Sequence, residues 1–215
     1  MATCEPVNYA LVEIWREYTS SFFHPSPRLT SLTDCNSTGV YGGVVANGNG
    51  VGSKDPSNAY NTMLRGLQHT DSEGVAQFTT VFPGHYSGRA VHIHVIAHLN
   101  ANVLSNGKYS GGTNAHVGQL FFDQNLITEV SAVSPYSGNT QSLTTNAADS
   151  IFVQEATSSD PVVEYSLLGS SVSDGIFGWV AFGINVSKSV SVNAAASLAA
   201  TVTVTNAGKQ VTGTP

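Results

Sequence analysis

Two histidines, an arginine and a tyrosine lie within a dozen residues of one another in this 215-residue chain. Alternate side chains of an extended strand share one face, so His92 and His94 are expected to project together and could bind one metal ion. Tyr86 and Arg89 precede them, in a segment that reads as a turn. The sequence predicts a metal site here, although a short His-x-His motif is also compatible with an ordinary polar pair on a strand.

Further motifs flank this segment on both sides. Residues 83–94 follow the pattern P-G-x-Y-x-x-R-x-x-H-x-H, residues 39–43 read GVYGG and residues 64–74 read LRGLQHTDSEG. Downstream, residues 118–123 read GQLFFD and residues 174–179 read DGIFGW. Together these motifs resemble the active site of the intradiol ring-cleavage dioxygenases, non-haem ferric enzymes that split catechols between their two hydroxyl-bearing carbons. The resemblance runs from Cys4 to about Asn185 and is closest to the secreted fungal branch.

The resemblance implies a cofactor, a substrate and a role for each site residue. Four side chains would hold a ferric iron, Fe(III): Tyr41, Tyr86, His92 and His94. Ferric iron favours anionic oxygen, and a bound metal can hold a tyrosine deprotonated although the usual tyrosine pKa is about 10. Tyr86 would also accept a substrate proton, Arg89 would stabilise negative charge on the ring, and Gln119 would help through a hydrogen bond. The partners would be a small aromatic diol and O2, and the product a cis,cis-muconate.

Other interpretations of these residues stay open. Tyr41 could be a packed strand aromatic, Arg89 a surface cation and Gln119 a satisfied buried amide. A second candidate function is a cupin-like metalloenzyme, in which the His-x-His pair recruits His116 and Glu129. A third is a non-catalytic β-sandwich binding module that has lost its metal.

The composition favours strands and turns. Only 10% of residues are charged and 21 are glycine, which predicts an all-β fold, and the resemblance specifies a two-sheet β-sandwich of the intradiol dioxygenase type with long loops. Residues 1–193 are expected to form one domain, with 16–34 as an inserted loop and 194–215 as a low-complexity extension. Strands are predicted within residues 10–15, 77–82, 92–99, 120–122, 151–153, 162–165 and 179–184, and a short helix from about residue 123.

Charge and hydropathy bear on partners and location. A net charge of −6 without a Lys/Arg cluster argues against nucleic acid, and no apolar run is long enough to cross a membrane. Low charge, sequons at Asn36 and Asn185 and two cysteines suggest a secreted protein whose amino-terminal targeting region is absent from this chain. The resemblance favours a Cys4–Cys35 disulfide, with two unpaired thiols as the alternative, and leaves a homodimer open.

Overall fold

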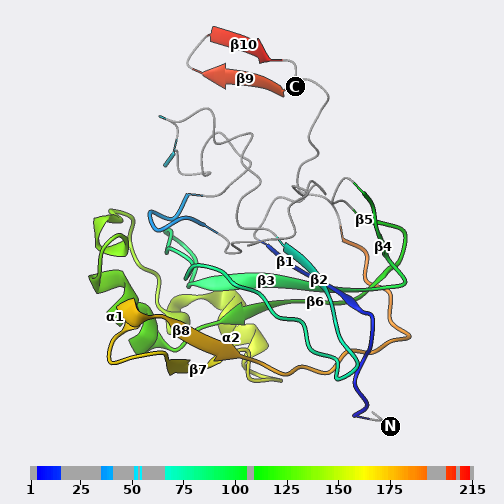
Figure 1. Cartoon of the computed structure of the whole chain (residues 1–215). Helices are drawn as coiled ribbons and strands as arrows, with labels where there is room; N and C mark the ends of the chain where they lie inside the picture. The colour runs from blue at the N-terminus through cyan, green and yellow to red at the C-terminus, as the bar shows by residue number, and fades with distance from the viewer. Residues whose placement is uncertain are drawn as a thin grey trace.

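A four-stranded antiparallel sheet forms the centre of the computed structural model (Figure 1). The structure describes residues 4–15, 35–40, 51–52, 54, 66–105, 109–192, 202–206 and 209–213. The sheet has the strand order β2-β1-β3-β6, so β1 and β3 are its inner strands. Its strands are β1 (Leu11–Trp15), β2 (Gly66–His69), β3 (His92–Leu99) and β6 (Thr113–Phe121). Strand β3 pairs with β1 on one side and with β6 on the other.

One face of the sheet carries the hydrophobic core. Ile93 and Val95 of β3 point into it together with Ile14 of β1. Helix α1 (Gln124–Ala132) covers this face with Leu126 and Ile127, and the hairpin of β7 (Glu164–Leu167) and β8 (Ile176–Trp179) packs beside it. Within the described part of the chain, the second layer is therefore a two-stranded hairpin with a helix.

The remaining elements are short. They are β4 Asn102–Val103, β5 Tyr109–Ser110, β9 Val202–Asn206, β10 Lys209–Gly213, α2 Ser150–Glu155 and the 3-10 helices η2 Tyr136–Gly138, η3 Asn146–Ala148 and η4 Val172–Asp174. Most of the described secondary structure is thus antiparallel strand with few helices, in line with the predicted all-β class. No helix among the described residues is long and apolar enough to span a bilayer.

Several predicted elements are confirmed and three are wrong. The strand expected at 179–184 is one of the three, because β8 already ends at Trp179 and residues 180–184 lie outside any strand. The strands expected at 10–15 and 92–99 form as β1 and β3, and Asp123 begins α1 by accepting the backbone amides of Asn125 and Leu126. Residues 77–82 lie outside any strand. Phe78 and Phe82 pack on the core, whereas the other four residues of the segment are exposed. Residues 151–153 belong to α2 and not to a strand, since Asp149 caps a helix there.

The predicted disulfide is not formed in this structure. Cys4 is exposed, whereas Cys35 is buried, and the two are not bonded to each other. The Cys35 thiol instead lies 3.4 Å from the carbonyl oxygen of Gly84. This contact ties residue 35 to the turn that precedes Tyr86, and not to the start of β1.

The face of the sheet opposite the core contains a buried polar cluster around His98 of β3. Its Nδ1 lies 2.8 Å from Asn114 Oδ1 and its Nε2 lies 2.9 Å from Glu13 Oε2. The amide nitrogen of Asn114 donates to Val190, which fixes the oxygen of that amide toward His98. The two ring nitrogens of His98 are thus both engaged, one by the Asn114 amide and the other by the Glu13 carboxyl group. Burial, and then the nearby Glu13 carboxylate, raises the pKa of Tyr109 to about 12, so this phenol stays neutral.

Substitution of His98 by alanine should strongly destabilise the fold. It leaves the buried Glu13 carboxyl group without its imidazole partner, and removing one partner of a buried pair of this kind costs about 3–5 kcal/mol when the pair is ionic and about 1–3 kcal/mol when it is a hydrogen bond between neutral groups. The free energy of unfolding in urea measures the loss. His69→Ala, at an exposed position at the end of β2, is the matched control and should change stability by less than about 0.5 kcal/mol.

The double variant Glu13→Ala/His98→Ala tests the coupling directly. Its loss of stability should be smaller than the sum of the losses in the two single variants, because it no longer buries a polar side chain without its partner. Strictly additive losses would mean that the two side chains do not stabilise each other.

Candidate active site

Tyr86, His92 and His94 come together beside the sheet face opposite the core. His92 and His94 lie on the same face of β3, with ring centroids 5.0 Å apart in an edge-to-face arrangement. Tyr86 precedes a tight turn that closes with a bridge to Arg89, and its ring centroid lies 6.1 Å from that of His92. The Tyr86 hydroxyl oxygen and both Nε2 atoms are buried. One phenol and two imidazoles therefore meet inside the protein.

A backbone carbonyl just before the start of β3 fixes the orientation of the His92 ring. Its Nδ1 lies 2.6 Å from the carbonyl oxygen of Ala90, an acceptor to which it can only donate. In a neutral imidazole this places the proton on Nδ1 and leaves the Nε2 lone pair available. Histidines that bind metals are commonly held in this way by a backbone carbonyl. The geometry around His92 thus suits a metal ligand.

Arg89 is held next to these rings by two acceptors from different elements. Its Nε donates to Asp149 Oδ2 at 2.8 Å, and a terminal nitrogen donates to Gln119 Oε1 at 2.5 Å. Gln119 lies on β6 directly opposite His94, so it comes from the same face of the sheet. The structure therefore brings three predicted residues, Arg89, Gln119 and His94, into one arrangement. In this arrangement the Gln119 side-chain oxygen accepts a hydrogen bond from the Arg89 guanidinium.

Asp149 is a site residue that the sequence prediction missed. Its side chain is fully buried, and Oδ2 accepts from the Ala90 amide at 2.7 Å as well as from Arg89. Oδ1 accepts the amides of Ile151 and Phe152 and so caps α2. Burial by itself raises the pKa of Asp149, but the bonds from Ala90, Phe152 and Arg89 outweigh it and lower the pKa overall. The residue is therefore an anion that fixes Arg89.

Glu155, at the end of α2, is a second acidic neighbour absent from the prediction. Burial raises the pKa of its carboxyl, and this effect exceeds the opposing influence of the Gln119 backbone amide and the Arg89 cation. Phe152 of the same helix packs edge-on against Phe121, whose ring lies 5.6 Å from that of His92. Helix α2 thus supplies both an acidic group and an aromatic group near the predicted site.

Residues 36–40 pack against the turn before Tyr86 through two glycines. A side chain at Gly39 would collide with the carbonyl oxygen of His85, and one at Gly84 with that of Asn36. The Gln141 side-chain amide supports the same contact by donating to the carbonyl oxygen of Gly39 at 3.1 Å, and the Gln141 backbone carbonyl oxygen accepts from His85 Nε2 at 2.9 Å. The segment that leads to residue 41 is therefore anchored beside the predicted site. Tyr41, the fourth predicted ligand, lies outside the described residues.

The two predicted glycosylation residues differ in their surroundings. The Asn36 side-chain oxygen accepts from Thr38 and Val40 and shapes the turn, so this side chain is part of the local fold. Asn185 is exposed, with its oxygen accepting from the Ser187 amide at 3.0 Å.

The cupin-like alternative finds no support in the arrangement of its residues. His116 pairs with Ala97 and stacks on Phe182, on the sheet face opposite His94. Glu129 lies on α1, which covers that other face. Among the described residues, no group of three or more His, Cys, Asp or Glu side chains could hold a metal. Within the described part of the chain, a metal bound by His92 and His94 would take its further ligand from a group of another kind, such as the Tyr86 phenol.

Comparison with known proteins agrees with the motif resemblance. The fold is similar to a solved structure of an intradiol ring-cleavage dioxygenase from Tetranychus urticae, with a TM-score of 0.59 and 29% identity over 85% of this chain and 74% of that one. A second solved structure, of a dioxygenase, gives a TM-score of 0.58 and 28% identity with the same coverage. No family model matches the chain, and no curated protein does. The predicted fungal branch is not tested by these likenesses.

Asp149→Asn should loosen Arg89 and weaken the fold at neutral pH. An amide cannot replace the charge-assisted bond to the guanidinium, so we expect a loss of about 2–3 kcal/mol in the free energy of unfolding in urea. The folded-state pKa of Asp149 lies below the usual value of 3.8, so its contribution is present above the usual value and disappears as pH falls through the lowered one.

Wild-type protein should therefore lose more stability than Asp149→Asn as the pH falls from neutral through the usual carboxyl pKa of 3.8 and below it. The matched control is Asp160→Asn, which removes an exposed carboxylate that accepts the Val162 amide. Equal acid sensitivity of wild type and Asp149→Asn would contradict the assignment of a buried anion at residue 149.

Proposed function

We propose that this protein is an intradiol ring-cleavage dioxygenase that opens a catechol-type ring with O2 to give a cis,cis-muconate-type product. The observation that carries the proposal is the buried meeting of Tyr86, His92 and His94 next to an anchored arginine, Arg89. The likeness to a solved intradiol ring-cleavage dioxygenase supports it independently.

The described residues fit a ferric ion, Fe(III). Tyr86 would supply an anionic oxygen, and His92 and His94 would supply Nε2 lone pairs, the orientation of His92 being fixed by Ala90. Tyr41 is proposed as the second phenolate. When bound, the ferric ion would supply a Lewis acid that makes the catechol more acidic and its ring more reactive toward O2.

Each neighbouring side chain then has a defined task. Tyr86 would accept a proton from a substrate hydroxyl at its phenol oxygen, because a phenolate is a sufficient base for a catechol. Arg89 remains protonated at any working pH and would stabilise negative charge that develops on the ring. Gln119 would act through Arg89, since its oxygen already accepts from that guanidinium. The aromatic rings of Phe121 and Phe152 would help to exclude water.

The overall reaction needs only the diol and O2. The bond between the two hydroxyl-bearing carbons breaks, and each of these carbons gains one oxygen atom from O2 to become a carboxyl carbon. The electrons that reduce O2 come from the same two carbons, so no external reductant is required. A secreted enzyme, acting outside the cell on small aromatic diols, remains the proposed setting.

Visible absorption and iron content of the purified protein test this proposal. We expect about one iron per chain and a tyrosinate-to-iron charge-transfer band that shifts when catechol is added without oxygen. His94→Ala should lose most of the iron and the band. Admission of O2 to the wild-type complex should release a muconate, detected by mass spectrometry with both oxygen atoms of labelled O2.

His116→Ala provides the matched control, because this histidine lies on the opposite face of the sheet. It should retain iron, colour and ring cleavage. A folded protein that stays colourless after addition of ferric ion, or one whose colour survives in His94→Ala but not in His116→Ala, would overturn the assignment.

A further inference from the structure

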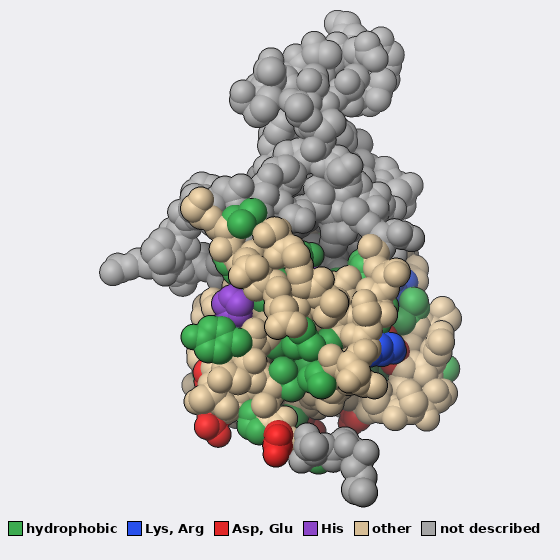
Figure 2. All heavy atoms as spheres, turned by 90° about the vertical axis from the view of Figure 1, so that its right-hand side faces the viewer, with side chains coloured by type: hydrophobic (Ala, Val, Ile, Leu, Met, Phe, Trp, Pro, Cys, Tyr) green, Lys and Arg blue, Asp and Glu red, His purple; other side chains and the backbone are tan. Residues whose placement is uncertain are grey.

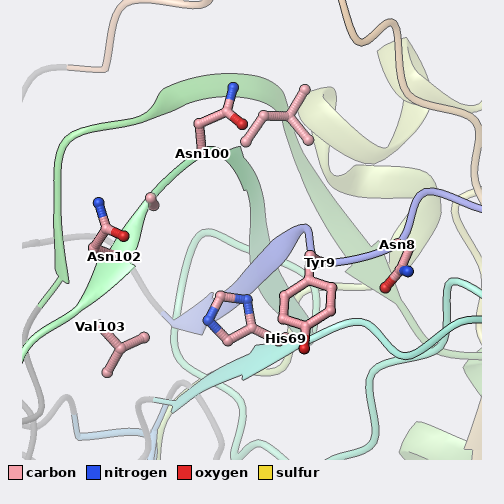
Figure 3. Close-up of a pocket in the computed structure, with 8 residues that line it drawn as sticks. Asn8, Tyr9, His69, Asn100, Asn102 and Val103 are labelled. Atoms are coloured by element: carbon pink, nitrogen blue, oxygen red, sulfur yellow. The ribbon is translucent and has the colours of Figure 1, made fainter.

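A pocket of about 630 Å³ lies at the other end of β3, away from the candidate active site. Figure 3 shows that it is bounded by the Tyr9 and His69 rings on one side and by Asn100, Asn102 and Val103 on the other. His92 begins β3 and the pocket begins where β3 ends, so the two sites are separated by roughly 23 Å of extended strand. The pocket is thus distinct from the site of the proposed ring cleavage.

The wall formed by Tyr9 presents an aromatic ring to solvent. The side chain is 74% exposed, and its ring centroid lies 5.7 Å from that of His69. The Tyr9 backbone has a φ of 58°, a left-handed conformation that costs a non-glycine residue free energy. Thr70 holds it there, because its carbonyl accepts the Tyr9 amide at 3.2 Å and its hydroxyl accepts the Ala10 amide at 2.9 Å. The backbone that carries the exposed ring is therefore anchored to the end of β2.

The opposite wall of the pocket is a turn that also contains a non-glycine residue with a positive φ. Asn100 has a φ of 57°, and together with Cys4 and Tyr9 it is one of the left-handed non-glycine residues of the described chain. Gly112 lets this turn pack closely, since a side chain there would lie 2.7 Å from the Leu99 carbonyl oxygen. Two of the three strained positions thus border one pocket. Such strain accumulates where the chain holds side chains for binding.

Three asparagine amides give the pocket neutral polar groups. They belong to Asn8, Asn100 and Asn102. Each amide offers both a donor and an acceptor. No Asp, Glu, Lys or Arg is among the described lining residues. Figure 2 shows that the side of the molecule at the β4–β5 end is likewise dominated by neutral polar and hydrophobic side chains.

We propose that this pocket binds a neutral saccharide. The C–H face of a sugar ring would stack on the exposed Tyr9 ring, and its hydroxyl groups, which both donate and accept, would pair with the Asn100 and Asn102 amides. The absence of charge in the described lining disfavours uronic acids and phosphorylated sugars. The site would anchor the protein to a carbohydrate while leaving the His92–His94 face unobstructed.

Titration with neutral hexasaccharides, followed by backbone amide NMR shifts, tests the proposal. The probes are cellohexaose, xylohexaose, maltohexaose and chitohexaose, with an oligogalacturonate of the same length as the charged probe. At least one neutral probe should shift the amides of residues 8–9, 69 and 100–103. The oligogalacturonate should bind more weakly than that probe.

Tyr9→Ala should weaken the binding of the active probe by about tenfold or more, because it removes the stacking surface. Asn102→Ala should weaken it as well and does not alter a strained backbone position. Phe177→Ala, which removes another exposed aromatic side chain, is the matched control and should leave binding unchanged. No shift with any neutral probe at about 10 mM, or binding that is indifferent to Tyr9→Ala, would overturn the proposal. The outcome does not depend on iron or on ring cleavage.

Discussion

Strand β3 is buried on both faces, and the packing of the elements around it depends on that constraint. A strand with water on one side can carry polar groups there without cost, but His92 and His98 are almost fully buried. A buried polar group is tolerated only when it is hydrogen-bonded or paired. The chain meets this requirement at His98 with Glu13 and Asn114, and it orients His92 through the Ala90 carbonyl. The aliphatic face of β3 can then pack into the core without competition.

The need to pair a buried charge also explains the position of Arg89. A guanidinium beside a buried site needs counter-charge, and Asp149 supplies it while also capping α2 and accepting the Ala90 amide. One carboxylate therefore fixes the arginine, the backbone before His92 and the start of a helix. The position of the cation relative to the histidines is set by the fold, because all of these partners are backbone groups or buried side chains.

The sequence predicted the parts of the site that depend on local geometry. The period of two along residues 92–99 placed His92 and His94 on one face, and the motifs indicated the family that the structural likenesses support. Asp149 was missed because it lies 60 residues from Arg89, and nothing local connects them. Its role as a helix cap was hidden by the apolar run at 151–153, which is too short to distinguish strand from helix.

The segment at 77–82 illustrates a different limit. Alternation of apolar residues indicates which side chains face a core, and Phe78 and Phe82 do pack against it. Pairing depends on whether a neighbouring strand edge is free, which a single sequence does not reveal. Tyr41 belongs to a third category, since it lies outside the described residues and stays a prediction.

The close contact between Gly39 and His85 has a consequence for how the protein folds. Gly39 and His85 are 46 positions apart in the chain and must meet before this contact can form. The contact therefore contributes no stability until a loop of that length has closed, at a cost in chain entropy. Strand pairing of β1 with β3 must bridge an even longer interval. Residues 36–40 therefore pack onto the turn before Tyr86 in a non-local step of folding. On a chain emerging from the ribosome, residues 36–40 appear first, and they can acquire this contact only after the 46 residues that follow Gly39 have been made.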